Sequence, residues 1–248
     1  RAAIESGAAT RPFGDFDAYH ERLNRFVFRS GFIMKPVFAR AKEAPKRVIY
    51  AEGEDERVLR ATQVVLEEKL ARPILVGRPS VVEARIKRFG LSIKAGKDFD
   101  LVNPEDDPRY RSYVQTYIDV AGRRGVTPEA ARTVVRTNNT VIAALAVVRG
   151  EADAMICGVE GRYMSHLRHV REIVGFLPGV RDFAALSMMI TSKGTYFIAD
   201  TQVRPNPSAE ELAEVASLAA IHVQRFNMKP RVAFVSHSDF GGYDTDSS

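Results

Sequence analysis

Residues 46–76 read KRVIYAEGEDERVLRATQVVLEEKLARPILV, and this stretch determines the fold class. Residues 47–50 read Arg-Val-Ile-Tyr, and their β-branched and aromatic side chains predict a strand. Residues 54–70 carry apolar side chains at helical spacing and predict a helix, and residues 73–76 predict a second short strand. A strand, a helix and a strand in this order are typical of an α/β protein with a mostly parallel sheet.

The alternation continues downstream to residue 174. Helices are predicted over residues 80–89 and 108–124, closed by Gly90 and Gly125, while residues 91–104 between them are turn-rich and polar. Thr127 and Pro128 begin a further helix to about residue 135, and Gly150 ends the next. A buried strand is predicted at 154–157 and a helix at 164–174.

The pattern changes after residues 177–179, which read Leu-Pro-Gly, so we place a subdomain boundary at 180–183. Residues 183–191 and 195–199 flank a Ser-Lys-Gly turn and predict an antiparallel hairpin. Ser208 and Glu211 form a capping box that opens a helix, and residues 231–235 predict a strand before a polar loop at 236–248.

Residues 1–45 have the pattern of a connector, in which Asp15 caps a helix with apolar positions between residues 16 and 27. The first residue is not methionine and the last ones form a loop, so we expect a piece cut at both ends. The predicted fold is therefore a three-layer, mostly parallel α/β sheet in two subdomains, 46–182 and 183–248, the second incomplete at its C-terminus.

The composition excludes several classes of protein. With 45% apolar and 27% charged residues the chain is globular, and its longest apolar run stops at Arg149, too short to cross a membrane. The single cysteine, Cys157, forms no internal disulfide and favours the cytoplasm. The net charge of +5 is scattered among acidic residues, which argues against nucleic acid and favours small phosphate-bearing ligands.

Two segments follow predicted strands at the sheet edge where α/β proteins bind ligands. The first contains Gly158, Gly161 and Arg162, with Arg168 and the residues after it on the next helix. The second is the loop with Ser236, Ser238 and Gly241. Each is also compatible with a plain turn, the first followed by a solvated basic helix face.

Other groups in the sequence carry weaker signals. Residues 52–56 hold four carboxylates around one glycine, which suits the start of a helix better than a phosphate loop. His166 and His169 lie on one helical face, but no metal motif accompanies them, so we predict no metal here. Cys157 is expected in the core, and the Arg78 side chain is expected in water.

Several segments together resemble the phosphate acetyl/butyryl transferase family. They are residues 46–59, 74–77, 150–158, 197–200 and 235–241, in matching order and spacing. Residues 5–12, 34–38 and 240–248 more narrowly resemble the bacterial hybrid NADP-dependent malic enzymes, in which a malic enzyme part precedes a phosphotransacetylase-like domain. The resemblance implies a sheet like that of the isocitrate and isopropylmalate dehydrogenases, with residues 1–45 as the end of the malic enzyme part and a linker helix.

The resemblance also bears on the chemistry of the site. A substrate-binding arginine of the family falls on Ala121 here, whereas a second family arginine matches Arg168. The serine-rich loop of the family is replaced by Glu-Gly-Arg-Tyr-Met at 160–164, and the segment with the family's catalytic serine, arginine and aspartate would lie beyond Ser248. The resemblance therefore implies a site that retains cations but loses donors for catalysis, with no catalytic residue in this segment.

The leading hypothesis is a regulatory domain that binds acetyl-CoA or a related acyl-CoA through Arg168, Gly158, Gly161, Arg162, Ser236, Ser238 and Gly241. The malic enzyme part of the same chain would then use NADP and Mg²⁺ or Mn²⁺ to convert malate to pyruvate, and the domain would join copies into a homo-oligomer. The alternatives are an active phosphate acetyl- or butyryltransferase and a purely structural dimerisation module.

Overall fold

The computed structural model describes residue 15 and residues 30–191 and 193–235. The chain divides into two compact units, one of residues 39–181 and one of residues 182–248 with those up to 38, and each is described by itself. The apolar positions of the helix predicted after Asp15 lie outside the described residues, as does the loop at 236–248.

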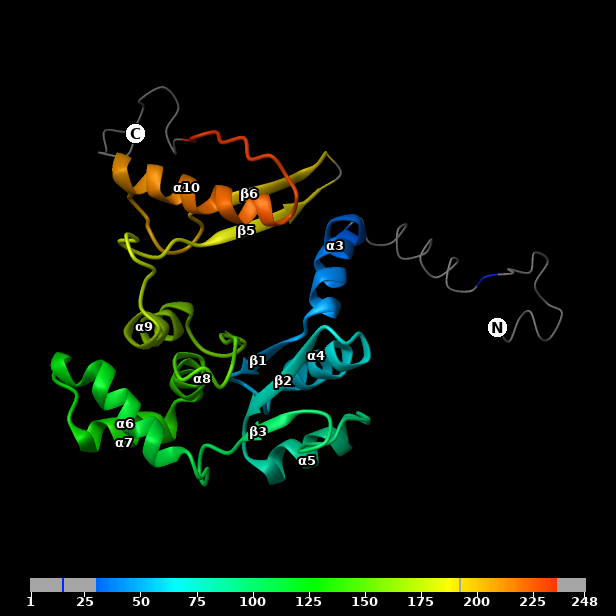
Figure 1. Cartoon of the computed structure of the whole chain (residues 1–248), viewed down its shortest axis with the longest axis vertical. Coiled ribbons are helices and arrows are strands. Elements are labelled where there is room, and N and C mark those ends of the chain that lie inside the picture. Colours follow the sequence, from blue (N-terminus) through cyan, green and yellow to red (C-terminus); the bar gives the residue numbers. More distant parts are fainter. Residues whose placement is uncertain (1–14, 16–29, 192, 236–248) are drawn as a thin grey trace. The chain divides into compact units, whose positions relative to one another are not determined.

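A four-stranded, fully parallel sheet organises residues 39–181, with the strand order β3-β2-β1-β4 (Figure 1). The strands are β1 (Lys46–Tyr50), β2 (Ala71–Val76), β3 (Asp100–Val102) and β4 (Ala154–Ile156). This sheet confirms the predicted α/β class. The short strand β3 was missed because three residues between turns carry no periodic signal, and β4 is an edge strand rather than a buried one, with Ile156 48% exposed.

Helices cover both faces of this sheet and produce the three predicted layers (Figure 1). On one face lie α4 (Glu56–Glu67) and α5 (Pro79–Arg88), and on the other α6 (Tyr110–Ala121), α7 (Pro128–Thr137) and α8 (Asn139–Val148). Neighbouring strand residues face opposite layers: Ile49 packs against the α6–α8 side and Tyr50 against the α4–α5 side. Because crossovers are right-handed, reversing direction from β3 back to β4 places the later helices on the opposite face.

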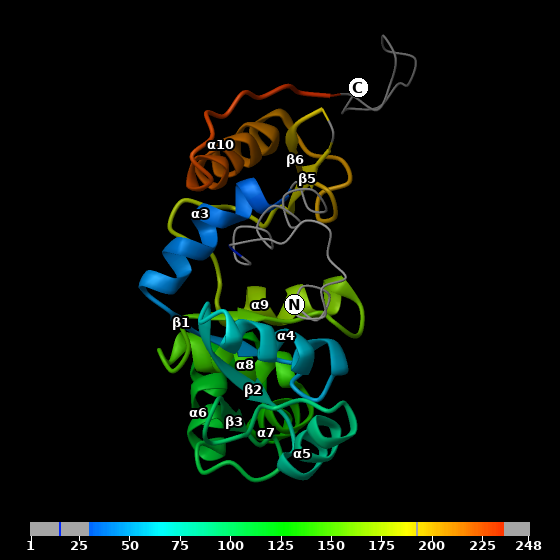
Figure 2. The ribbon, with the colours of Figure 1, turned by 90° about the vertical axis from the view of Figure 1, so that its right-hand side faces the viewer.

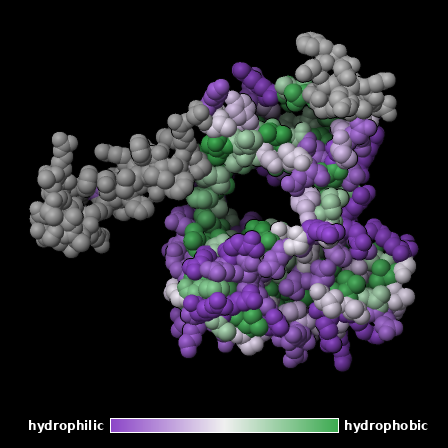
Figure 3. All heavy atoms as spheres, turned by 180° about the vertical axis from the view of Figure 1, so that it is seen from behind, coloured by the Kyte–Doolittle hydropathy of each residue, from purple (hydrophilic) through white to green (hydrophobic). Residues whose placement is uncertain are grey.

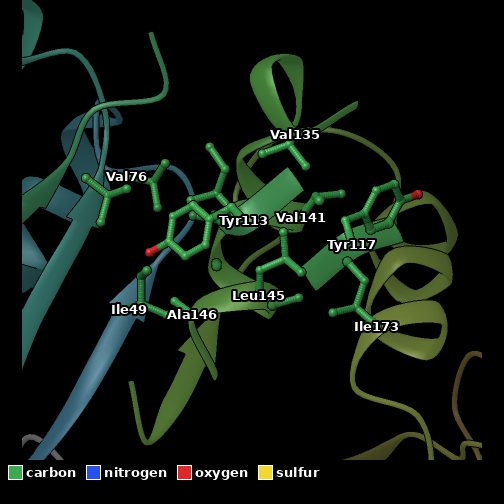
Figure 4. Close-up of a cluster of buried hydrophobic side chains, with 14 of the residues drawn as sticks. Ile49, Val76, Tyr113, Tyr117, Val135, Val141, Leu145, Ala146 and Ile173 are labelled. Atoms are coloured by element: carbon green, nitrogen blue, oxygen red, sulfur yellow. The ribbon is translucent and has the colours of Figure 1, made fainter. Parts of the chain in front are cut away.

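The larger core lies around α8, whose residues Thr140 to Ala146 are all buried. Tyr113 of α6 lies between the sheet residues Ile49 and Val76 and the helix α8, as Figure 4 shows. At the far end of the same cluster, Tyr117 lies beside Ile173 of α9 (Tyr163–Ile173). The core therefore connects the sheet to α9, the helix on which Arg168 is located.

Capping residues in the sequence predicted most helix ends correctly. Thr127 caps α7 through Ala130 N–H with Pro128 in the first turn, as predicted. Gly53 follows β1 where the chain passes directly over β2, and a Cβ there would lie 2.7 Å from the backbone oxygen of Val76. A glycine is required at this position by the close approach of two backbone segments.

The unit that begins at residue 182 contains the predicted hairpin, β5 (Leu186–Ile190) and β6 (Thr195–Ala199), beside α10 (Ala209–Arg225) (Figure 2). The predicted capping box opens α10, and Phe197 of β6 packs on Phe226 with ring centroids 5.6 Å apart. The strand predicted at 231–235 is wrong, because these residues pair with no neighbouring strand among the described residues.

A further helix, α3 (Ser30–Glu43), occupies part of the segment predicted as a connector. Pro36 lies inside it, and because an internal proline usually ends a helix, no helix was predicted over these residues. No helix in the described ranges is both long and apolar enough to span a membrane. Hydrophilic side chains cover much of the face seen in Figure 3.

Candidate functional site

The strand order creates a topological switch point between β1 and β4. From β1 the chain proceeds outward to β2 and β3 and then returns to the other side of β1 to form β4. Beyond their carboxyl ends lie Glu52 and Gly158, with Ala51 N–H donating to the Ile156 carbonyl at 3.0 Å. Open α/β sheets bind ligands at such a position, so the structure places Gly158 where the sequence predicted a site.

A carboxylate occupies this switch point. Gly158 N–H donates to Glu52 Oε1 at 2.8 Å, and the other oxygen, Oε2, is buried without a hydrogen-bond partner among the described residues. His166 Nδ1 lies 3.9 Å from Oε1. The backbone donor that a bound anion would use is therefore already engaged, and the Glu52 charge repels an anion.

His166 holds the loop at 158–162 in place. Its Nε2 lies 2.6 Å from the Glu160 carbonyl oxygen, which can only accept, so Nε2 carries a proton. Its Nδ1 lies 2.8 Å from the Thr140 hydroxyl, which completes its hydrogen bonds. Gly161 has a φ of 91°, and a Cβ there would approach His166 Nε2 to 2.9 Å. The ring thus connects the loop at 158–162 to helix α8.

A polar hollow of about 300 Å³ extends from Glu52 and Glu160 along the carboxyl edge of the sheet. Within it Arg78 binds Glu54 with both arms of its guanidinium, at 2.8 and 2.9 Å, and Arg85 donates to the Glu54 carbonyl. The expectation that Arg78 lies in water alone is wrong: its bidentate hydrogen bonds lower the pKa of Glu54. Residues 52–56 thus lead into the start of helix α4, as predicted, and Asp55 is its N-cap.

A second hollow, of about 820 Å³, lies between α6, the 3₁₀ turn η1 (Gly122–Arg124), α7 and α9. We call it the arginine groove. Its cationic side chains are Arg124, Arg168 and Arg171, and Glu172 is the only acid among its lining residues. Its other lining side chains are mostly apolar or aromatic: Tyr117, Val126, Ala130, Val134 and Phe176. Such a mixture of apolar walls and a few charged groups is typical of ligand sites.

Arg168 lies in this groove with its side chain exposed. The described residues offer its guanidinium no hydrogen bond or ion pair. Tyr117 donates to Glu172 Oε2 at 3.1 Å, and burial together with that carboxylate raises the pKa of Tyr117 to about 12. The phenol therefore remains a donor at neutral pH, next to the Arg168 charge.

Asn138 fixes the protonation of His169 in the wall of the groove. The Asn138 Oδ1 accepts from Val141 N–H at 3.2 Å as the N-cap of α8, so its Nδ2 must donate to His169 Nε2, 3.0 Å away. The ring is then neutral with its proton on Nδ1, which is buried without a partner in the described chain and lies 3.9 Å from Glu172 Oε2. Burial, followed by the Arg168 charge, lowers the pKa of His169 and favours this neutral form.

The structure separates the predicted site residues. Gly158 and Gly161 belong to the loop at the switch point, and Arg162 is the N-cap residue of α9, whereas Arg168 lies in the arginine groove. The predicted residues Ser236, Ser238 and Gly241 lie outside the described residues. Tyr117, Arg124 and Phe176 were not predicted as site residues, because no local sequence pattern shows that they line the same hollow as Arg168.

Two further predicted positions have structural roles. Cys157 is half-buried against the larger core, as expected, and burial, with the nearby Glu52 charge, raises the pKa of its thiol. Such a thiol is a poor nucleophile at neutral pH. Ala121 is fully buried at the end of α6, so its side chain does not line either hollow.

The strand order and the helices on both faces of the sheet define a doubly wound α/β fold. Residues 32–248 match the family described as phosphate acetyl/butaryl transferase, and the chain belongs to this family. The EutD phosphotransacetylase from Staphylococcus aureus has the same fold, with a TM-score of 0.75 at 24% identity over 87% of this chain and 64% of that one.

The chain is also similar to two malic enzymes. An NAD-dependent malic enzyme of Rhizobium meliloti is 63% identical over 249 residues, which cover 100% of this chain and 32% of that protein. An NADP-dependent malic enzyme of Escherichia coli is 50% identical over 248 residues, which cover 100% of this chain and 33% of that protein. The chain thus spans about a third of the length of the malic enzymes it matches.

Proposed function

We propose that this chain is the phosphotransacetylase-like domain of a malic enzyme, that it binds acetyl-CoA or a related acyl-CoA, and that it regulates the enzyme without catalysing acyl transfer. One observation carries the proposal. Arg168, the arginine that matches the family, lines a groove with no charged partner among the described residues, while the loop at 158–162 holds Glu160 and His166 in mutual contact rather than donors facing a ligand. The groove therefore offers a positive charge for binding, whereas the described residues of the loop offer no groups positioned for catalysis.

The loss of catalysis follows from what acyl transfer requires. Transfer between a thiol and phosphate needs a base to activate the thiol and donors around the developing oxyanion. His166 has both nitrogens engaged by Thr140 and the Glu160 carbonyl, and the neutral His169 ring is held by Asn138. Neither histidine of the described site can therefore take a proton from a thiol without breaking a structural hydrogen bond.

The remaining parts of the proposal concern the longer protein. We assign oxidation of malate and its decarboxylation to pyruvate to a malic enzyme part that precedes this domain in the longer protein, with residues 1–45 as its end and linker. Mg²⁺ or Mn²⁺ would polarise the carbonyl during decarboxylation, and NADP would accept the hydride. We assign NADP and the metal ion to the malic enzyme part; in the part of the chain that the structure describes, no three His, Cys, Asp or Glu side chains are grouped as metal ligands. We further propose that the protein is cytoplasmic and that copies of this domain associate.

The full-length enzyme tests this function directly. Malate oxidation is followed with NADP and with NAD, because malic enzymes that use each coenzyme are among the relatives, and acetyl-CoA is added in both cases. We expect acetyl-CoA to bind in calorimetry and to change the rate, and we expect no CoA-dependent release of phosphate from acetyl phosphate. Absence of acetyl-CoA binding would overturn the regulatory role, and phosphate release would establish an active transferase instead.

A further inference from the structure

Two histidines of α9 contact the start of α8. His166 Nδ1 lies 2.8 Å from the Thr140 hydroxyl, and His169 Nε2 lies 3.0 Å from the Asn138 amide nitrogen. Asn138 is the N-cap of α8 and Thr140 belongs to its first turn, so both rings hold the same helix end. His166 also donates to the backbone of the loop at 158–162. We call these four side chains the histidine latch.

The two contacts differ in how they respond to a second proton on the ring. The Thr140 hydroxyl can donate or accept, so its contact with His166 can persist in either protonation state. The Asn138 amide nitrogen can only donate, and it faces the one nitrogen of His169 that lacks a proton. A proton on that nitrogen would place two donors 3.0 Å apart with no acceptor between them. Acid therefore breaks the contact of His169 and not that of His166.

The Asn138 side chain has a single oxygen, and α8 already uses it. Oδ1 accepts from Val141 N–H at 3.2 Å and caps the helix. To accept from a protonated His169 ring, the amide must turn over. Its NH2 group then faces Val141 N–H, and that donor loses its partner. The amide therefore serves either the helix cap or the protonated ring.

The charged and titratable groups around His169 favour its neutral form on balance. The groove that it lines contains Tyr117 of α6, Arg124 of η1, and Arg168, Arg171 and Glu172 of α9. In the described part of the chain, α7 adds only apolar side chains to this lining, and the contact with the start of α8 is an uncharged amide. Burial and then the Arg168 charge lower the pKa of His169. The Glu172 carboxylate, 3.9 Å from Nδ1, opposes them, and His166 adds to them.

We propose that the histidine latch is a pH-sensitive device that couples the start of α8 to the loop at 158–162. Protonation of His169 takes the Asn138 oxygen from the helix, and the first turn of α8 opens. Thr140 lies in that turn, so its contact with His166 is lost and the loop is released. The loop beside the Glu52 carboxylate is thus held at neutral pH and loosened in acid. This proposal goes beyond the proposed function and does not depend on acyl-CoA binding.

Hydrogen–deuterium exchange of the full-length enzyme between about pH 7.5 and about pH 5, corrected for the intrinsic effect of pH on exchange, tests the latch. Peptides from the start of α8 and from the loop at 158–162 are expected to exchange about fivefold faster in acid, the factor that corresponds to loss of an N-cap. His169→Gln cannot take up a proton but keeps an oxygen that accepts from Asn138, so both peptides should lose the response. His222→Gln, at an exposed position of α10, is the matched control and should leave the response unchanged.

Two further variants test the steps of the coupling. Thr140→Val removes the hydroxyl that contacts His166, so α8 should still respond to acid whereas the loop should no longer follow it. Asn138→Asp supplies two oxygens, one for the helix cap and one for the protonated ring, so acid should not open α8. Asn138→Asp also keeps the test decisive if His169→Gln does not fold, which urea unfolding at about pH 7.5 shows directly.

Each result either supports or overturns the proposal. An acid response of both peptides that His222→Gln retains, and that His169→Gln and Asn138→Asp abolish, supports the latch. The latch is wrong if neither peptide of the unmodified enzyme responds to acid, or if His169→Gln or Asn138→Asp responds as the unmodified enzyme does. If the loop responds equally in Thr140→Val, the coupling through Thr140 is wrong. None of these results depends on whether acetyl-CoA binds, so the proposed function is tested separately.

Discussion

Replacing Asn138 tests the connection between helix α8 and the His169 ring, because one amide serves both. Its Oδ1 caps α8 and its Nδ2 donates to His169 Nε2 at 3.0 Å. Asn138→Ala removes a cap that contributes about 1 kcal/mol and a hydrogen bond that contributes about 1 kcal/mol. We expect a loss of about 2 kcal/mol, which corresponds to about thirtyfold faster amide exchange in α8 where local opening limits it.

Asn138→Asp separates the two contributions. A carboxylate can still cap α8, but its second oxygen faces His169 Nε2 and favours a protonated ring, so the pKa of His169 should rise. In the unmodified protein the pKa of His169 is lowered, so its contribution to stability is present above about pH 6.5, the ordinary pKa of histidine, and is lost as the pH falls below that value and through the lowered pKa of the folded state. In Asn138→Asp the sign reverses: the contribution is present below about pH 6.5 and is lost as the pH rises through the raised pKa.

Hydrogen–deuterium exchange of α8 peptides and urea unfolding of the full-length protein, each at pH 7.5 and pH 5.5, measure these effects. Thr127→Ala is the matched control, because it removes the N-cap of the neighbouring helix α7 without touching His169. It should cost about 1 kcal/mol at both pH values. The reasoning fails if Asn138→Asp and Asn138→Ala respond alike to pH, or if the exchange of α8 is the same in Asn138→Ala as in the unmodified chain.

Two further predictions concern the fold, and urea unfolding of the full-length protein checks both. Gly53→Ala should destabilise the protein by about 1–3 kcal/mol, because the new Cβ would lie 2.7 Å from the Val76 oxygen. The control Gly122→Ala should not destabilise it, because the new Cβ has only an ordinary contact at 3.6 Å. Equal effects of the two substitutions would contradict this prediction. Tyr113→Phe should cost about 2 kcal/mol because the buried hydroxyl donates to Glu151 Oε2 at 2.6 Å; an unchanged midpoint would show that this hydrogen bond contributes nothing net.

The layers of the fold could be predicted because their causes are local. The run at 47–50, the cap at Thr127 and the capping box at Ser208 each act within a few residues, and all three elements form as expected. The two wrong strand predictions have causes that lie outside the strands themselves. The strand β3 forms because β2 is available to pair with it, and residues 231–235 form no strand because no described neighbour pairs with them.

The candidate site was harder to predict because its members are distant in sequence. Arg168 and Arg162 are six residues apart, and this closeness in sequence suggested one site, yet Arg162 is the N-cap residue of α9 whereas Arg168 lines the arginine groove. Tyr117 approaches Arg168 only through the packing of α6 on α9. Nor does any pattern of residues indicate that the Glu52 carboxylate would fill the switch point.

Binding and catalysis can separate in this domain because they depend on different physical properties. Binding an organic phosphate needs a concentration of positive charge and an apolar surface, and both tolerate displacements of a side chain. Catalysis needs a base and donors held within narrow distances of the reacting atoms. In the groove the arginines meet the first requirement, whereas the hydrogen bonds of His166 and His169 are committed to the loop at 158–162 and to the cap of α8. Under the proposed function, acyl transfer would require rebuilding two structural contacts, whereas binding of a ligand would require only that Arg168 and its neighbours stay in place.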